Sequence, residues 1–322
     1  MRTKNRTILM IITCVGLMIS SCNTRNDQNN TSGKGTVKAT ETVTDKSLEP
    51  LDIQSIKNII DIEGKENNGE YKIVVPQNDL KVMVDGFQII PPMGLGSWAA
   101  FSPAKNGAMV MGDVIVTEDD LWPVQQEVIR QGLTITAIHN HFVRNNPNVM
   151  YMHIGGMGKE KELASKVKAV FNKVENSRGG NPANGLKTEV ENSLDTAMIA
   201  KILGHSGQLN RGVYKVTIGR PDVDLLDHGS PVSTFMGFNT WASWQGTPER
   251  AAVAGDFTML ADEVAPVIKA LVENDIEVVA VHNHMVHEKP RIFFLHFWGI
   301  GNSEKLAKGL RQALDQTGSV SN

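Results

Sequence analysis

Residues 134–142 read TITAIHNHF, and residues 277–285 read EVVAVHNHM. The two His-Asn-His triplets are 143 residues apart, and the same offset relates matching positions along most of the chain without a gap. It pairs His153 with His296, Gly112-Asp113 with Gly255-Asp256, and Trp98-Ala99 with Trp241-Ala242. The chain therefore contains one domain twice.

Hydrophobic periodicity predicts the same order of elements in each copy. In the first copy we expect a helix, a strand, an irregular stretch, and then strand, helix, strand, turn, strand and helix, over 51–60, 71–75, 91–98, 108–116, 119–130, 133–142, 145–148, 149–154 and 160–171. The crossover helix allows parallel pairing of the strands before and after it, and the short turn forces an antiparallel hairpin. This order matches most of a split β-α-β, ferredoxin-like unit. We predict an α+β fold of two tandem pseudo-symmetric repeats, each a mixed β-sheet with helices packed on it.

The domain boundaries follow from the repeat. Repeat 1 covers residues 51–174 and repeat 2 covers residues 194–317. Between them, residues 175–193 contain Arg178-Gly179-Gly180-Asn181-Pro182, a cluster of turn formers that predicts an inter-domain linker. We expect the two repeats to pack about a pseudo-two-fold axis.

The first 22 residues have the pattern of a secretory signal. Three basic residues precede the apolar run Ile8–Met18, which is shorter than the roughly 20 residues that span a bilayer. Ile19-Ser20-Ser21-Cys22 resembles a bacterial lipobox, which predicts lipidation at Cys22 and an exported protein anchored to a membrane of the cell envelope. An ordinary cleaved signal is the alternative. Residues 23–50 are rich in Asn, Thr, Ser and Lys and predict a disordered tether.

The remaining composition excludes several functional classes. Cys14 and Cys22 are the two cysteines of the chain, so the predicted folded part has neither a cysteine nucleophile nor a Cys-ligated metal. The net charge of −3, without basic clusters, argues against nucleic acid as a partner. Any metal would be held by His, Asp or Glu.

The histidines are the strongest indication of chemistry. His139 and His141 are two apart on a predicted strand and point to one face. A hairpin centred near Asn146 would place His153 opposite His139 and diagonal to His141. The set His139, His141 and His153 is repeated as His282, His284 and His296. We therefore expect one three-histidine centre in each repeat for a divalent transition metal, with zinc or iron favoured.

Other readings of these residues stay open. The histidines can instead form a hydrogen-bonded structural cluster that duplication has copied. Asp113 and Asp256 are candidates for orienting a histidine, for a fourth ligand or for a catalytic base, and the alternative for each is a turn aspartate. In the loop that follows Met93, Gly94 permits close approach of another backbone or side chain.

The lipoprotein signal, the doubled domain and the pattern H-N-H-x₅-P-x₅-H-x₂-G-x-G, which starts at His139 and again at His282, together resemble the LppY/LpqO family of bacterial lipoproteins. The repeated domain of that family is of unknown function. The resemblance covers residues 51–317 and implies an exported bacterial protein. It implies no activity, ligand or catalytic residue.

Without a cysteine or a G-x-S-x-G motif, a metal-activated water is the favoured nucleophile. We predict a metal-dependent envelope hydrolase that acts on a small substrate, with Asp113 and Asp256 as candidate bases. A binding module that captures a metal or small ligand without turnover is the first alternative. A structural envelope component, in which the histidines only tie the hairpin together, is the second.

Overall fold

Two similar halves make up the described part of the chain. The computed structural model describes residues 48–318, which belong to one compact unit. The predicted signal segment, Cys22 and nearly all of the predicted tether lie outside these residues. Within 48–318, no helix has both the length and the apolar character needed to cross a membrane.

Each half has three helices and a six-stranded sheet, together with short accessory strands. The elements of the first half are α1 Ile53–Ile60, β1 Gly64–Asn67, β2 Glu70–Pro76, β3 Val82–Val84, β4 Phe87–Ile89, η1 Pro91–Met93, β5 Gly96–Ala104, β6 Gly107–Thr117, α2 Glu118–Arg130, β7 Thr134–His139, β8 Asn145–Asn146, β9 Val149–Gly158 and α3 Glu160–Arg178. The short η2 Pro182–Asn184 follows. The elements of the second half are α4 Thr196–Leu203, β10 Gly207–Asn210, β11 Val213–Ile218, β12 Leu226–Asp227, β13 Ser230–Pro231, β14 Thr240–Gly246, β15 Ala251–Leu260, α5 Ala261–Glu273, β16 Glu277–His282, β17 Glu288–Lys289, β18 Ile292–Gly301 and α6 Ser303–Leu314.

The predicted α+β class and the tandem repeat are confirmed. The sheets have the equivalent orders β1-β2-β5-β6-β9-β7 and β10-β11-β14-β15-β18-β16. The strands β6 and β7 flank the crossover helix α2 and run parallel, as in a split β-α-β unit. One expected detail differs: these strands do not pair with each other, because β9 lies between them and is antiparallel to both. Neighbouring strands of this sheet are antiparallel throughout, so its pairing is not mixed.

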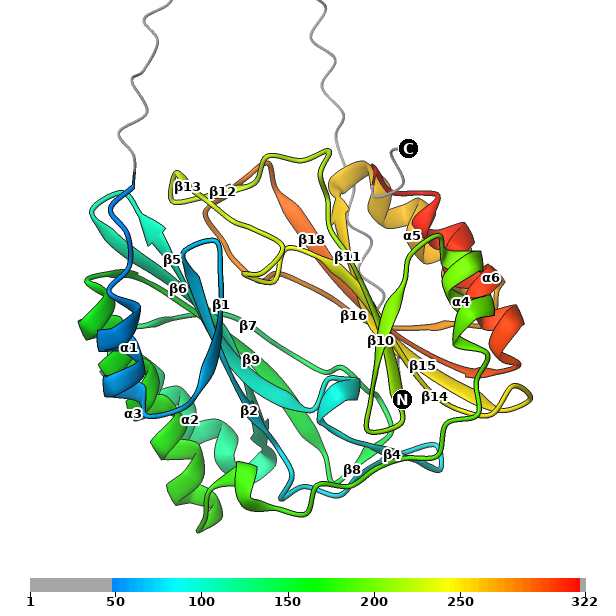
Figure 1. Ribbon diagram of the computed structural model, residues 1–322, viewed down its shortest axis with the longest axis horizontal. Coiled ribbons are helices and arrows are strands. Elements are labelled where there is room, and N and C mark those ends of the chain that lie inside the picture. Colours follow the sequence, from blue (N-terminus) through cyan, green and yellow to red (C-terminus); the bar gives the residue numbers. More distant parts are fainter. Residues whose placement is uncertain (1–47, 319–322) are drawn as a thin grey trace, which may run out of the picture. The chain divides into compact units, whose positions relative to one another are not determined.

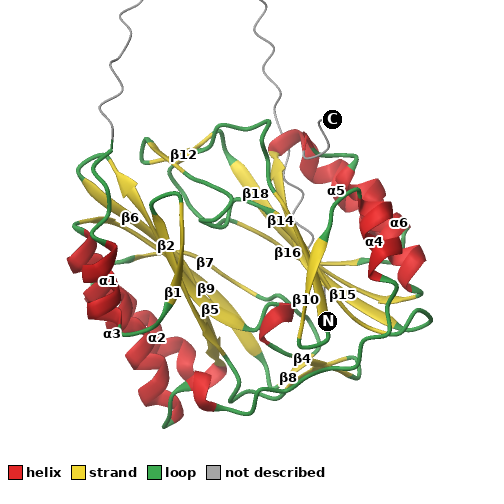
Figure 2. Ribbon diagram, viewed as in Figure 1, coloured by secondary structure: helices red, strands yellow, loops and turns green. Residues whose placement is uncertain are grey.

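The helices cover only the outer face of each sheet, and the uncovered faces of the two sheets lie toward each other (Figures 1 and 2). One apolar core lies beneath α1, α2 and α3, and an equivalent core lies beneath α4, α5 and α6. The α2 helix begins where Thr117 and Asp120 form a capping box, with acidic residues in its first turn. The α3 helix continues to Arg178, beyond the expected end of repeat 1.

Two further cores join the repeats. In one, Val82, Val84 and Phe87 of the β3–β4 hairpin pack with Ala252 and Trp298 of the second half. In the other, residues after β11, among them Leu225, Val232 and Met236, pack with β5 and β6 of the first half. Each repeat therefore covers part of the open sheet face of the other. Residues 175–193 connect two halves of one unit and not two separate bodies.

The strand β7 is shorter than predicted, and its register with β9 differs from the expected one. His139 pairs with Tyr151, and His153 pairs with Ala137. The cause lies in the loop, because Asn145 and Asn146 pair with β3 in a separate small sheet and do not close a tight hairpin. The register moves by two residues, so His139 and His153 still share one face. His141 lies beyond the end of β7.

Candidate metal centre

The predicted histidines lie at the junction between the repeats, on four strands and in the bends that follow two of them. His139 and His282 are the last residues of β7 and β16. These are the edge strands of the two sheets, and they contact each other. His153 and His296 lie in β9 and β18, which are second from the same edges. His141 and His284 occupy the bends that follow β7 and β16.

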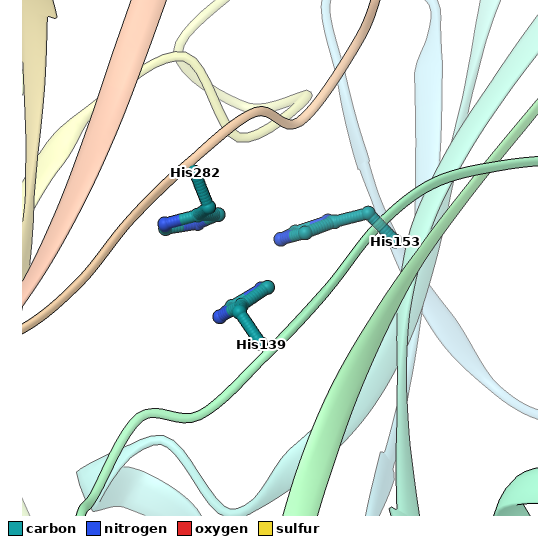
Figure 3. A group of neighbouring side chains, drawn as sticks. All are labelled: His139, His153 and His282. Carbon is teal, nitrogen blue, oxygen red and sulfur yellow. The ribbon is translucent and has the colours of Figure 1, made fainter. Parts of the chain in front are cut away.

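All six histidines converge in one cluster, where the sequence led us to expect a separate trio in each repeat. The ring centres of His139 and His282 lie 3.8 Å apart. The pair His141 and His296 is separated by 3.7 Å, and its pseudo-symmetric counterpart, His284 and His153, by 4.1 Å. Figure 3 shows the rings of His139, His153 and His282 directed toward one another from both halves. The cluster therefore belongs to the pair of repeats.

Three groups within the cluster have ligand atoms close enough to share one ion, since all lie within 4.8 Å of one another. Two of the groups contain histidines from both repeats, and the third contains an aspartate and two histidines of repeat 2. The groups are His139, His153 and His282; His139, His141 and His296; and Asp256, His282 and His296. Nitrogen and carboxylate ligands of this kind suit zinc or iron.

The hydrogen bonding of the cluster fits a metal. Nδ1 of His153 lies 3.3 Å from the carbonyl oxygen of Gly112, and Nδ1 of His296 lies 3.0 Å from that of Gly255. Metal-bound histidines commonly donate their other ring N–H to a backbone carbonyl in this way. The Nε2 atoms of His153 and His296 are buried without a partner among the described residues, and so are both ring nitrogens of His139 and His282. Buried polar atoms normally have partners, and an ion bound here would supply one to each of these nitrogens.

Burial keeps the imidazoles neutral, which is the form that binds metals. It lowers the pKa of His139, His141 and His153 well below the usual value, and neighbouring histidines lower these pKa values further. The pKa of His296 falls to about 4, mainly by burial.

Both predicted aspartates reach the cluster. An Oδ2 of Asp113 lies 3.7 Å from Nε2 of His141, and the equivalent distance from Asp256 to His284 is 3.3 Å. Burial raises the pKa of Asp113 to about 8, with a further contribution from Asp256, and burial raises that of Asp256 to about 6. Each aspartate has one buried oxygen without a partner in residues 48–318. A cation at this position would favour the ionised carboxylates.

A cavity of about 670 Å³ opens beside the cluster and is lined by both repeats. Asp113, Asp256 and four of the histidines form part of its wall. Two lysines that we did not predict as functional, Lys72 and Lys215, line it as well. Their positions in the sequence could have pointed to them. Each lysine lies between two apolar residues of a predicted strand, and the offset of 143 residues relates one lysine to the other.

The histidines without a counterpart lie elsewhere. His228 and His287 are exposed, and their ring centres lie 4.4 Å apart. His205 is half-buried. None of the three belongs to a group of the described residues with metal-ligand spacing.

Comparison with known proteins adds a family and little more. A family model described as Domain of Unknown Function (DUF1259) matches residues 54–173 and again residues 197–316. A search of the curated proteins finds no match.

Two solved structures align with the chain at low similarity. The trimeric bacterial microcompartment shell protein PduB is 7% identical, with 79% of this chain and 89% of that chain covered and a TM-score of 0.19. EtuB from Clostridium kluyveri is 6% identical, with the same coverage and a TM-score of 0.18. At such TM-scores the likeness carries no argument about fold or function.

Proposed function

The chain belongs to the family of the Domain of Unknown Function DUF1259, which it contains twice, and we propose that the two copies together build one metal centre that hydrolyses a small substrate. The observation that carries this proposal is the set of buried nitrogen and oxygen atoms without partners. Every one of the six histidines and both aspartates contributes at least one such atom in the described part of the chain. Leaving a polar atom buried and unpaired costs about 1–3 kcal/mol, so an apo cluster of this size would be costly.

The histidines and the aspartates of the cluster have different proposed roles. Histidines from both repeats would hold a divalent ion, with zinc or iron best suited to the donor set. When bound, such an ion supplies a nucleophile at neutral pH by lowering the pKa of water to about 7. Asp113 and Asp256 lie beside the histidines and at the cavity wall, where a carboxylate can accept a proton from water or orient an imidazole.

The cellular setting of the proposal comes from the sequence outside the described residues. The apolar run Ile8–Met18 and the lipobox-like Ile19-Ser20-Ser21-Cys22 support export and lipidation at Cys22. We accordingly place the activity in the bacterial cell envelope, with a lipid anchor to a membrane, as the resemblance to the LppY/LpqO lipoproteins implies.

Elemental analysis of the purified full-length protein tests the metal centre. We expect the wild type to contain zinc or iron, and the double variant His139→Ala with His282→Ala to lose the metal together with hydrolysis of ester and phosphoester substrates. The matched control is His228→Ala with His287→Ala, which removes two exposed histidines outside the cluster. Unchanged metal content in the His139 and His282 variant would reject the proposal.

A second candidate is a binding protein that holds a metal or small ligand without turnover. The nearly complete burial of the cluster favours it, since Asp113, His153, Asp256 and His296 are all at most 3% exposed. A metal held this deeply could meet a substrate only through the cavity beside the cluster. This candidate predicts that metal raises the melting temperature while no substrate of the panel yields a product.

A further inference from the structure

Two half-buried lysines face the cavity from equivalent positions. Lys72 lies in β2 and Lys215 in β11, and their side chains point away from the helix-covered cores that hold Tyr71, Ile73 and Val216. Each lysine places its Nζ over a tryptophan of its own repeat, at 3.9 Å from the ring centre of Trp98 and 4.1 Å from that of Trp241. The pseudo-symmetry of the repeats thus brings two cationic groups to one cavity.

Among the described residues these lysines make no ion pair, although Asp113 and Asp256 line the same cavity and attract Lys72 and Lys215, respectively, from farther away. Within residues 48–318, no carboxylate oxygen lies within 4 Å of either ammonium group. Nζ of Lys72 donates one hydrogen bond, to the carbonyl oxygen of Phe235 at 3.2 Å. Glu70, which is near in sequence, instead accepts a hydrogen bond from Ser233. Burial lowers the pKa of Lys72 to about 7, and repulsion from Lys215 contributes; burial lowers the pKa of Lys215 to about 8.

A cation withdrawn from water is normally paired, and two lysines whose nearest carboxylates lie beyond 4 Å can both bind an anion that enters the cavity. The cavity volume of about 670 Å³ falls in the range of small-molecule sites, which is about 300–1,000 Å³. Trp98, Trp241 and Phe235 provide apolar walls on the same surface. Size and charge together therefore select a compact anion over a polymer.

We propose that this cavity binds a small dianion, a phosphate-like group or a short dicarboxylate, held between Lys72 and Lys215 and beside the histidine cluster. The argument for dianion binding rests on the lysines and does not require the proposed function. The further statement that the dianion is the substrate does rest on the proposed function. Charge-assisted hydrogen bonds from the two ammonium groups would carry the affinity. The tryptophans would keep the lysines in place through their ring faces.

Isothermal titration calorimetry on the full-length chain tests the proposal. The probes are sulfate as a compact tetrahedral dianion, succinate as a dicarboxylate, and acetate as a monoanion. The test variant is Lys72→Met with Lys215→Met, which keeps the apolar stems and removes both charges. The control is Lys81→Met with Lys201→Met, which removes the same charge from exposed lysines outside the cavity. Melting curves verify that every variant folds.

We expect sulfate or succinate to bind the wild type and the control with equal affinity. The affinity of the test variant should be lower by about tenfold or more. Sulfate alone would identify a phosphate-like ligand, and succinate alone a dicarboxylate. Equal binding by the test variant, acetate affinity equal to that of the dianions, or no binding of either dianion would overturn the proposal. Each titration is repeated after metal removal, with metal content measured. If a dianion still binds after metal removal, its binding does not require the metal centre. The two proposals can therefore fail independently.

Discussion

Gly94 adopts a positive φ of 98°, a conformation that residues with a Cβ rarely take. A Cβ added there would lie 3.1 Å from the ring of Trp241 and 3.5 Å from Nδ1 of His141. Gly237 has the same relation to Trp98, at 3.0 Å. The prediction that this glycine permits a close approach agrees with these contacts. Sequence could not identify the approaching group, because each tryptophan comes from the other repeat.

We predict that Gly94→Ala lowers the free energy of unfolding by about 2–4 kcal/mol, from backbone strain of about 1 kcal/mol together with crowding of Trp241. Gly69→Ala is the matched control, since Gly69 also has a positive φ, 79°, but no atom within 4 Å of the added Cβ. Urea unfolding measures both variants. Equal losses in the two would show that contact with Trp241 is unimportant.

At the scale of elements, α2 and α3 are joined by a buried ion pair. Nε of Arg178, the last residue of α3, lies 2.7 Å from Oδ2 of Asp120 in the first turn of α2. Arg178 also donates to the carbonyl oxygen of Ile115 at 3.0 Å. The second half uses Glu263 at the position of Asp120, but its partner is Arg220, from the loop after β11. The acidic first turn is visible in the sequence, whereas the partner of Asp120 is not.

We predict that Asp120→Asn costs about 3 kcal/mol of stability near neutral pH, because it leaves Arg178 without its most buried partner. Burial alone would raise the pKa of Asp120, but hydrogen bonds from Ser177, the Thr117 backbone and Arg178 outweigh it and lower the pKa. A lowered pKa stabilises the fold above the unfolded-state pKa of about 3.9, and this contribution disappears as pH falls through the folded-state pKa.

Urea unfolding at pH 6 and at a pH near 3 measures this effect. The difference in unfolding free energy between wild type and Asp120→Asn should shrink at the lower pH. Glu118→Gln, which changes an acidic residue of the same turn that makes no ion pair in the described structure, should show no such trend. A difference that does not depend on pH would contradict the assigned role of Asp120.

At the scale of the whole molecule, the repeats share both their apolar packing and their candidate site. The hairpin β3–β4 packs against β15 and β18 of the other half, and Arg144 connects Asp85 of its own repeat to Glu277 of the other. Thr136 of β7 donates a hydrogen bond to the carbonyl oxygen of His284 at 2.7 Å. These contacts hold the two His-Asn-His segments against each other.

We predict that His139→Ala alone depletes metal from the whole cluster and not from half of it, because His139 belongs to two of the three candidate ligand groups. Loss of one ligand typically weakens metal binding strongly, since even partners of ligands matter about 10–100-fold. Metal content and metal-dependent melting temperature are the measurements. If His139→Ala retained half of the wild-type metal at full affinity, the repeats would carry independent centres. His205→Ala is the control.

The duplication, the α+β class, the crossover around α2 and the identities of the six histidines and two aspartates follow from the sequence alone. They are encoded in local periodicity and in the constant offset between copies, neither of which requires knowledge of the packing. Only the tertiary structure decided the register of β7 on β9, the merging of two trios into one cluster, and the place of Lys72 and Lys215 beside it. Each of these depends on how the open face of one sheet meets the other repeat, and that contact arises from side chains far apart along the chain.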